Sequence, residues 1–172
     1  MSVQPPPDRP LGRWQRQVAV IGASGTGEGD DAWTLAEQVG RGLAEANVAL
    51  VCGGGGGVME AASRAAREAG GTVIGIVPST SVNDVNVYCS YVVATGIGHA
   101  RNLAVVSSGE AVIAIGGEWG TLSEIGFARV IGHEVVALRS WELNGRERMA
   151  GGPGVVAAET AEEAVAAALA AL

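Results

Sequence analysis

The sequence contains no lysine, and this absence excludes several enzyme classes. All 11 basic residues are arginine, against 18 acidic residues, so the formal net charge is −7. Schiff-base enzymes, pyridoxal phosphate enzymes and Walker-type nucleoside triphosphatases each need a lysine at the reacting centre. Because affinity for a nucleic-acid backbone comes from clustered lysine and arginine, we also expect no nucleic-acid partner. Any anion must therefore be captured by a local site.

Few cysteines and short apolar runs limit the chain further. Cys52 and Cys89 lie far apart, without a Cys-x-x-Cys motif, so we expect two reduced, mostly buried thiols and no metal. Residues 111–115, a typical apolar run, are far shorter than the roughly 20 residues of a membrane span. Residues 1–16 hold three consecutive prolines and no stretch typical of a secretion signal. We therefore predict a flexible arm over residues 1–16, no membrane association and a cytoplasmic location.

Strand and helix patterns alternate along the rest of the chain. With 172 residues, 48% of them apolar, the chain has the size and core of one domain, predicted over residues 17–172. The predicted strands are residues 17–21, 48–52, 72–77, 91–94, 111–115, 134–138 and 155–158. The predicted helices are residues 32–46, 58–69, 99–107, 121–131 and 161–172, the last capped by Thr160. This alternation predicts a three-layer Rossmann-like α/β fold, with a mostly parallel sheet of six to seven strands and helices on both faces.

Three glycine-rich turns each join a predicted strand to a predicted helix. They span residues 22–29, 53–57 and 116–121. In a parallel sheet such turns meet at the carboxyl edge, where helix N-termini expose unpaired amides and a partial positive charge. Consecutive glycines also let the backbone approach a ligand closely. The turns therefore predict a site for a phosphate-bearing, nucleotide-like molecule, with tight helix-to-sheet packing as the structural alternative.

A dinucleotide site is a competing interpretation, because the first turn contains Gly25-x-Gly27. Such a site also needs an acidic residue at the end of the second strand, where it binds the ribose hydroxyls. That strand ends at Cys52 without a carboxylate, so NAD and FAD are disfavoured and we expect no cofactor. Residues 79–90 form a polar loop after the third strand, and loops in this position often cover a ligand.

Four side chains near the turns are candidates for ligand chemistry. Arg101 lies near the start of a predicted helix and could bind an anion or pair on the surface. Glu124 lies one turn into a helix, where it could face the ligand or only complement the helix dipole. His99 suits ligand contact or packing equally. Trp119 suits ligand stacking, a subunit interface or packing.

Three segments, GGGGGVMEAASRAARE, TGIGHARN and GGEWGTLSEIGFA, resemble the Lonely Guy-like (SLOG) superfamily, and most closely its molybdenum-cofactor-carrier-like branch. The resemblance covers residues 18–138. The superfamily is often mislabelled as lysine decarboxylases, an activity that we do not expect here. Lonely Guy enzymes release a base from a nucleoside 5′-monophosphate, and their signatures resemble Met-His-x-Arg-Lys and Pro-Gly-Gly-x-Gly-Thr-x-x-Glu. Arg101 and Glu124 match the signature arginine and glutamate, and are the predicted catalytic residues.

The turns and the resemblance together predict the rest of the site. The predicted phosphate- and nucleotide-binding residues are Gly22, Ser24, Gly54, Gly55, Gly56, Gly57, Val58, Met59, His99, Gly117, Gly120 and Thr121. The departures of the chain from the Lonely Guy signatures include Gly116 for proline, Glu118 for glycine and Asn102 for lysine. Glu118 would repel a phosphate dianion unless it points away or contacts another group. These departures fit the carrier-like branch.

Two functions therefore stay open, and a purely structural scaffold ranks behind both. The first is hydrolysis of the N-glycosidic bond of a nucleoside 5′-monophosphate, giving the base and ribose 5-phosphate. The second is a non-catalytic carrier or sensor, with the molybdenum cofactor or a nucleotide as its cargo. The resemblance also implies a homodimer or higher homo-oligomer, and the mean hydropathy of +0.27 agrees with helix faces buried between subunits.

Overall fold

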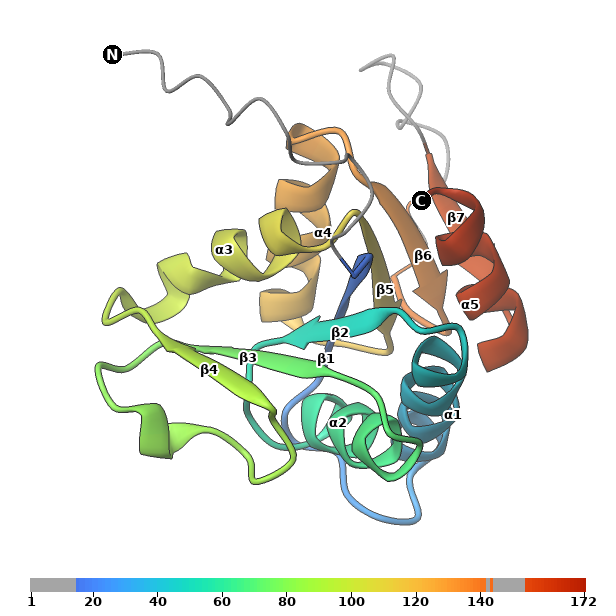
Figure 1. The fold of residues 1–172 in the computed structure, drawn as a ribbon. Coiled ribbons are helices and arrows are strands. Elements are labelled where there is room, and N and C mark those ends of the chain that lie inside the picture. Colours follow the sequence, from blue (N-terminus) through green and yellow to red (C-terminus); the bar gives the residue numbers. More distant parts are fainter. Residues whose placement is uncertain (1–14, 142, 144–153) are drawn as a thin grey trace, which may run out of the picture.

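Seven parallel strands form the sheet at the centre of the protein (Figure 1). A computed structural model of the chain describes residues 15–141, 143 and 154–172. The strands lie in the order β4-β3-β2-β1-β5-β6-β7, and each neighbouring pair is parallel. They are β1 (Gln17–Gly22), β2 (Ala49–Cys52), β3 (Val73–Val77), β4 (Tyr91–Ala94), β5 (Ala111–Ile115), β6 (Glu134–Leu138) and β7 (Val155–Ala158). The central strands read as unbroken apolar runs because both of their faces are buried.

Helices cover both faces of this sheet. In the described part of the chain they are α1 (Asp31–Glu45), α2 (Val58–Glu68), α3 (Arg101–Ser108), α4 (Trp119–Val130) and α5 (Ala161–Ala170). Figure 1 shows α3 and α4 on one side of the sheet and α1 and α2 on the other. The core follows this division, since α1, α2 and α5 contribute to one apolar cluster and α3 and α4 to a second. The predicted three-layer Rossmann-like fold is confirmed.

Element boundaries differ from the prediction at two helix starts. α4 begins at Trp119, two residues before the predicted start, because Gly116 and Gly117 complete the turn with φ values of +54° and +118°. A 3-10 turn (Gly98–Ala100) precedes α3, which therefore begins at Arg101. At α5, Thr160 forms the expected cap, and its hydroxyl and the Glu163 side chain make a reciprocal capping box.

The predicted arm over residues 1–16 falls mostly outside the described residues, as do residues 142 and 144–153. Gln15 and Arg16 are described and contact the domain. The Gln15 amide donates to the Asn47 carbonyl at 3.4 Å, and the Arg16 guanidinium pairs with Glu110 at 2.8 Å. Among the described residues, no helix is long and apolar enough to cross a membrane.

The strand order creates a reversal point beside β1. From β1 the chain winds outward through β2, β3 and β4, then returns to place β5 on the other side of β1. Connections on the two sides of β1 lead into helices on opposite faces of the sheet, so the turns separate at the carboxyl ends of β1 and β5. In open parallel sheets this separation produces the ligand-binding crevice.

Close contact between α1 and α2 depends on a glycine in α1. A Cβ at Gly40 would overlap the carbonyl oxygen of Ala62 on α2. Replacement of Gly40 by alanine would therefore force the two helices apart, although alanine has the higher helix propensity.

We predict that Gly40→Ala lowers the free energy of unfolding by about 1–3 kcal/mol, the usual cost of overpacking a core. Gly126→Ala is the matched control, because an added Cβ at this exposed position on α4 meets nothing within 4 Å. The control should stabilise the protein by up to about 1 kcal/mol through helix propensity. Urea denaturation measures both variants, and equal stability of the two would contradict the packing argument.

Candidate functional site

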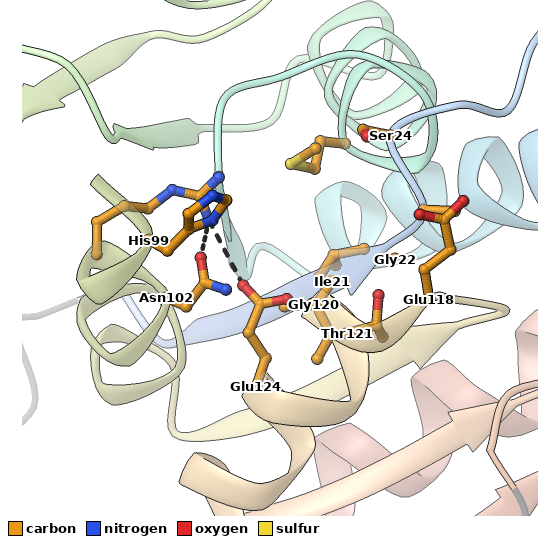
Figure 2. Close-up of a pocket in the computed structure, with 14 residues that line it drawn as sticks. Ile21, Gly22, Ser24, His99, Asn102, Glu118, Gly120, Thr121 and Glu124 are labelled. Atoms are coloured by element: carbon orange, nitrogen blue, oxygen red, sulfur yellow. Dashed lines mark hydrogen bonds and ion pairs between the residues drawn. The ribbon is translucent and has the colours of Figure 1, made fainter.

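A pocket opens at the carboxyl edge of the sheet, at the reversal point beside β1 (Figure 2). Its wall combines the end of β1 and the loop that follows, the first glycine of the 53–57 turn, one residue of α2, the start of α3 and the start of α4. The lining residues are Val20, Ile21, Gly22, Ala23, Ser24, Gly53, Met59, His99, Arg101, Asn102, Glu118, Gly120, Thr121 and Glu124. Segments far apart in sequence therefore meet in one site.

A buried ion pair lies in the pocket wall between α3 and α4. Arg101 Nη1 is 3.5 Å from Glu124 Oε1, and the two side chains are only 15% and 9% exposed. The same Nη1 donates to Asn102 Oδ1 at 2.7 Å, and Asn102 is itself buried. The Arg101 Nε donor is buried and has no partner among the described residues. The guanidinium is thus held in place while it keeps hydrogen-bonding capacity.

Burial changes the acidity of Glu124. Loss of hydration raises the pKa of this carboxyl from 4.5 to about 7, although the positive charge of Arg101 opposes the rise. The negative charge that Cys52 can carry adds to the rise. Glu124 therefore changes its protonation state near neutral pH, as a catalytic acid or base requires.

Arg101 can approach the backbone closely because Gly53 has no side chain. A Cβ at Gly53 would lie 2.7 Å from both terminal nitrogens of Arg101. Two other glycines of the turns have structural roles. Gly57, with φ of +65°, passes against the carbonyl of Ala23, and a Cβ at Gly117 would lie 2.6 Å from Thr121.

The 79–90 loop supports the glycine turn and contributes no residue to the pocket wall. The Asn86 N–H donates to the Gly54 carbonyl at 2.7 Å, and its side-chain amide donates to the Gly55 carbonyl at 3.0 Å. Both bonds occupy carbonyls of the turn. The loop that we expected over a ligand therefore fixes the glycine turn from behind.

Cys52 lies beneath the same turn. It is fully buried, and its Sγ accepts a hydrogen bond from the Gly54 N–H at 3.4 Å and lies 3.5 Å from Ser63 Oγ. Contact with the Cys89 thiol, these hydrogen bonds and the charge of Arg101 lower the pKa of Cys52 to about 7, against the opposing effect of burial. Both cysteines are free thiols, and Cys89 is only half-buried.

The predicted site residues divide into two groups. The structure brings Gly22, Ser24, Met59, His99, Arg101, Gly120, Thr121 and Glu124 together in the pocket wall. It places Gly54, Gly55, Gly56, Gly57, Val58 and Gly117 in the turns behind that wall. The Val58 N–H is moreover already bonded to the Ala23 carbonyl at 3.0 Å. Direct ligand contact is therefore better supported for the first group.

Sequence reasoning left Gly53 and Asn102 out of the binding set. In a run of five glycines, no sequence signal indicates which one faces a pocket. Asn102 stands next to Arg101 and was noted only as a departure from the Lonely Guy signature, but it is the residue that fixes the guanidinium. Its position directly after Arg101 in the TGIGHARN segment was the sequence signal that could have placed it in the site.

Glu118 and Trp119 begin α4 in different surroundings. Glu118 lines the pocket, and Figure 2 shows it apart from the group formed by His99, Asn102 and Glu124. Trp119 is 77% exposed and lies against Trp141, with ring centroids 5.4 Å apart. Trp119 does not line the pocket.

Metal ligation has no suitable cluster in the part of the chain that the structure describes. No group of three or more histidine, cysteine, aspartate or glutamate side chains is placed to hold an ion there. The pocket instead offers one guanidinium, two carboxylates, an imidazole, hydroxyls and backbone amides.

Comparison with known proteins assigns the family. The model of the SLOG cluster4 family matches residues 15–165, which include every element that builds the pocket. The chain belongs to this family. An uncharacterised protein of Archaeoglobus fulgidus is 41% identical over 124 residues, 72% of this chain and 80% of that protein.

Two further proteins that are similar to this chain have descriptive names. A probable cytokinin riboside 5′-monophosphate phosphoribohydrolase of Oryza sativa subsp. japonica is 34% identical over 64% of the chain, and the matched region spans about half (46%) of the rice protein. The structure of the molybdenum cofactor carrier protein of Chlamydomonas reinhardtii superposes with a TM-score of 0.82 at 28% identity. That match covers 92% of this chain and 98% of the carrier.

The raised pKa of Glu124 predicts a pH-dependent loss of stability. Because the folded state holds this proton more tightly than the unfolded state, the contribution is complete below pH 4.5 and is lost as the pH rises through 7. Relative to Glu124→Gln, wild-type protein should lose roughly 3 kcal/mol of unfolding free energy between pH 4 and pH 8.

Urea denaturation at a series of pH values measures this difference. Glu110→Gln is the control of opposite sign, because pairing with Arg16 lowers the pKa of Glu110 and its contribution is lost as the pH falls. Parallel stability curves for wild type and Glu124→Gln would show that Glu124 keeps an ordinary pKa.

Proposed function

We propose that the pocket binds a nucleoside 5′-monophosphate and hydrolyses its N-glycosidic bond. The observation that carries this proposal is the buried Arg101–Glu124 pair in the pocket wall. A buried ion pair is weak evidence for a stabilising role, because desolvation of the two charges costs as much as their attraction returns. Its position at the ligand crevice favours a chemical role.

Glu124 is the candidate catalytic group. Hydrolysis breaks the bond between C1′ and the base nitrogen through a transition state with oxocarbenium character. An ionised carboxylate beside the ribose stabilises that positive charge and accepts a proton from the attacking water. The water oxygen bonds to C1′ as the bond to the base breaks, the proton taken up by Glu124 passes to the departing base nitrogen, and ribose 5-phosphate is the second product.

Arg101 and the glycine turns are the candidate phosphate ligands. The guanidinium offers donors beyond those bound by Asn102 and Glu124, and it rests on Gly53 at the start of the 53–57 turn. The N-terminus of α2 lies behind the pocket wall and adds partial positive charge through the helix dipole, without a lysine. This arrangement suits a protein with net charge −7, since the anion is bound by local dipoles.

A carrier or sensor without turnover is the second candidate. It is favoured by the carrier structure from Chlamydomonas reinhardtii, which matches nearly its whole length to this chain, whereas only about half of the rice phosphoribohydrolase is matched. Glu118 and Asn102 also replace a glycine and a lysine of the hydrolase signatures. The cargo in this case is the molybdenum cofactor or a nucleotide in the same pocket.

Turnover distinguishes the two candidates. Purified protein incubated with a panel of nucleoside 5′-monophosphates should release ribose 5-phosphate, with a rate that rises as the pH passes through about 7 and Glu124 ionises. Glu124→Gln should lower the rate by at least about 100-fold, as expected for loss of a general base, and Glu162→Gln on α5 should leave it unchanged.

Release that survives in Glu124→Gln would overturn the catalytic role of Glu124. Ligand-induced thermal stabilisation without any release would favour the carrier, and Arg101→Ala should then abolish the thermal shift. If no phosphate compound produces either signal, the binding proposal itself fails.

The same proposal includes a homodimer. Leu103 on α3 and Phe127, Val130 and Ile131 at the end of α4 expose large apolar side chains, and Val130 is 85% exposed. An exposed apolar surface on two neighbouring helices is typical of a subunit interface. A second copy of the chain is the occupant that the family resemblance implies.

Size-exclusion chromatography with light scattering should give about twice the chain mass of 17.3 kDa. Val130→Asp should shift the protein to the monomer, because it buries a charge in the contact. Val87→Asp is the control, since Val87 is 87% exposed but lies in the 79–90 loop. A monomeric wild-type protein would rule out this interface.

A further inference from the structure

The Arg101–Glu124 pair is spaced so that its carboxylate receives no hydrogen bond. Arg101 Nη1 lies 3.5 Å from Glu124 Oε1, beyond the roughly 2.7–2.9 Å of a hydrogen-bonded guanidinium and carboxylate. Among the described residues, the pKa of Glu124 responds to burial and to the charges of Arg101 and Cys52, with no hydrogen bond among the causes. Buried polar groups are normally hydrogen-bonded, so the open pair has a specific cause.

Asn102 takes the donor that Glu124 lacks. The same Nη1 donates to Asn102 Oδ1 at 2.7 Å, and Figure 2 draws both contacts as dashed lines. A guanidinium has donors only, so the oxygen of the amide must face it. Neighbouring residues on a helix normally point in different directions, and the bond therefore holds the Arg101 side chain back along the start of α3. Asn102 is only 8% exposed, so water does not readily replace its oxygen.

We propose that Asn102 is a positioning residue that holds the Arg101 guanidinium off Glu124 and keeps this carboxylate free for water or a ligand. The amide oxygen is a neutral acceptor, so it fixes the guanidinium without adding a charge. A direct ion pair with two hydrogen bonds would instead occupy both groups. The lysine of the Lonely Guy signature could not act in this way, because an ammonium has no acceptor.

The spacing accounts for the dominance of burial at Glu124. Desolvation raises the pKa of its carboxyl to about 7 although Arg101 is near, whereas a guanidinium in direct contact lowers a carboxyl pKa by about 1–3 pH units. The other titratable groups around Glu124 are Cys52 at the end of β2, His99 in the turn before α3 and Glu118 on its own helix. The strands beneath α4 present apolar side chains of the second core cluster.

NMR titration of isotope-labelled glutamate side chains measures the effect on the full chain, with Glu124→Gln identifying the Glu124 signal. Wild-type Glu124 should titrate with a midpoint near pH 7. In Asn102→Leu the guanidinium loses its acceptor and turns to Glu124, so the midpoint should fall by at least about one pH unit. A purely structural amide predicts the opposite, because leucine removes a polar group beside the carboxyl and increases its desolvation.

Asn102→Asp is the variant of opposite sign. It keeps the acceptor in the same place and adds a negative charge, so the Glu124 midpoint should rise above the wild-type value. Asn83→Leu is the matched control, an exposed asparagine of the 79–90 loop that does not line the pocket, and it should leave the midpoint unchanged. The same signs should appear in a Cys52→Ser background, which removes the other charge that raises the pKa of Glu124.

The titration separates this inference from the proposed hydrolysis, because it needs no turnover. A Glu124 midpoint in Asn102→Leu at or above the wild-type value overturns the role of Asn102. If Asn102→Leu does not fold, a midpoint in Asn102→Asp at or below the wild-type value does so.

The effect on turnover rests on the proposed function. Where ribose 5-phosphate is released, the pH of half-maximal rate should move with the NMR midpoint in each variant. A rate profile that stays fixed while the midpoint shifts would leave the role of Asn102 intact and contradict Glu124 as the catalytic base.

Discussion

The parallel pairing of β1 with β5 is the contact on which the site depends. Its register runs from Val18 opposite Ala111 to Gly22 opposite Ile115, so both strands end at the same level. The chain leaves β1 toward β4 and returns at β5, and the helices that directly follow these two strands, α1 and α4, cover opposite faces. The crevice at this reversal brings the start of α3 and the start of α4 next to the end of β1. Without this strand order, Arg101 and Glu124 would not meet.

The charged side chains of this pocket distinguish it from a site built only to bind phosphate. A single guanidinium is held by Asn102 and opposed by Glu124, while Glu118 adds a second carboxylate at the other end. Burial raises the pKa of Glu124 to about 7, so this carboxyl is only partly ionised near neutral pH, which reduces the negative charge beside a bound anion. The pocket wall thus contains one guanidinium and two carboxylates.

Hydrolase and carrier remain the alternatives because they need the same fold and much of the same pocket. Function on a shared fold is decided by individual side chains, and proteins named for both activities resemble this chain. The position of Glu118 is therefore informative, since it is a residue of the pocket wall at which the chain departs from the hydrolase signature.

The sequence by itself determined the order and type of the elements, because alternating apolar runs and amphipathic segments report which faces each element buries. It also identified Arg101 and Glu124 as a pair worth testing, and the three turns as the edge where a ligand would bind. Only the tertiary structure decided which turn residues reach the pocket. Gly53 lines it and Gly54 to Gly57 do not, a difference set by φ angles and by the bonds from Asn86 that no local pattern encodes. The burial that raises the pKa of Glu124 likewise arises from contacts between segments distant in sequence.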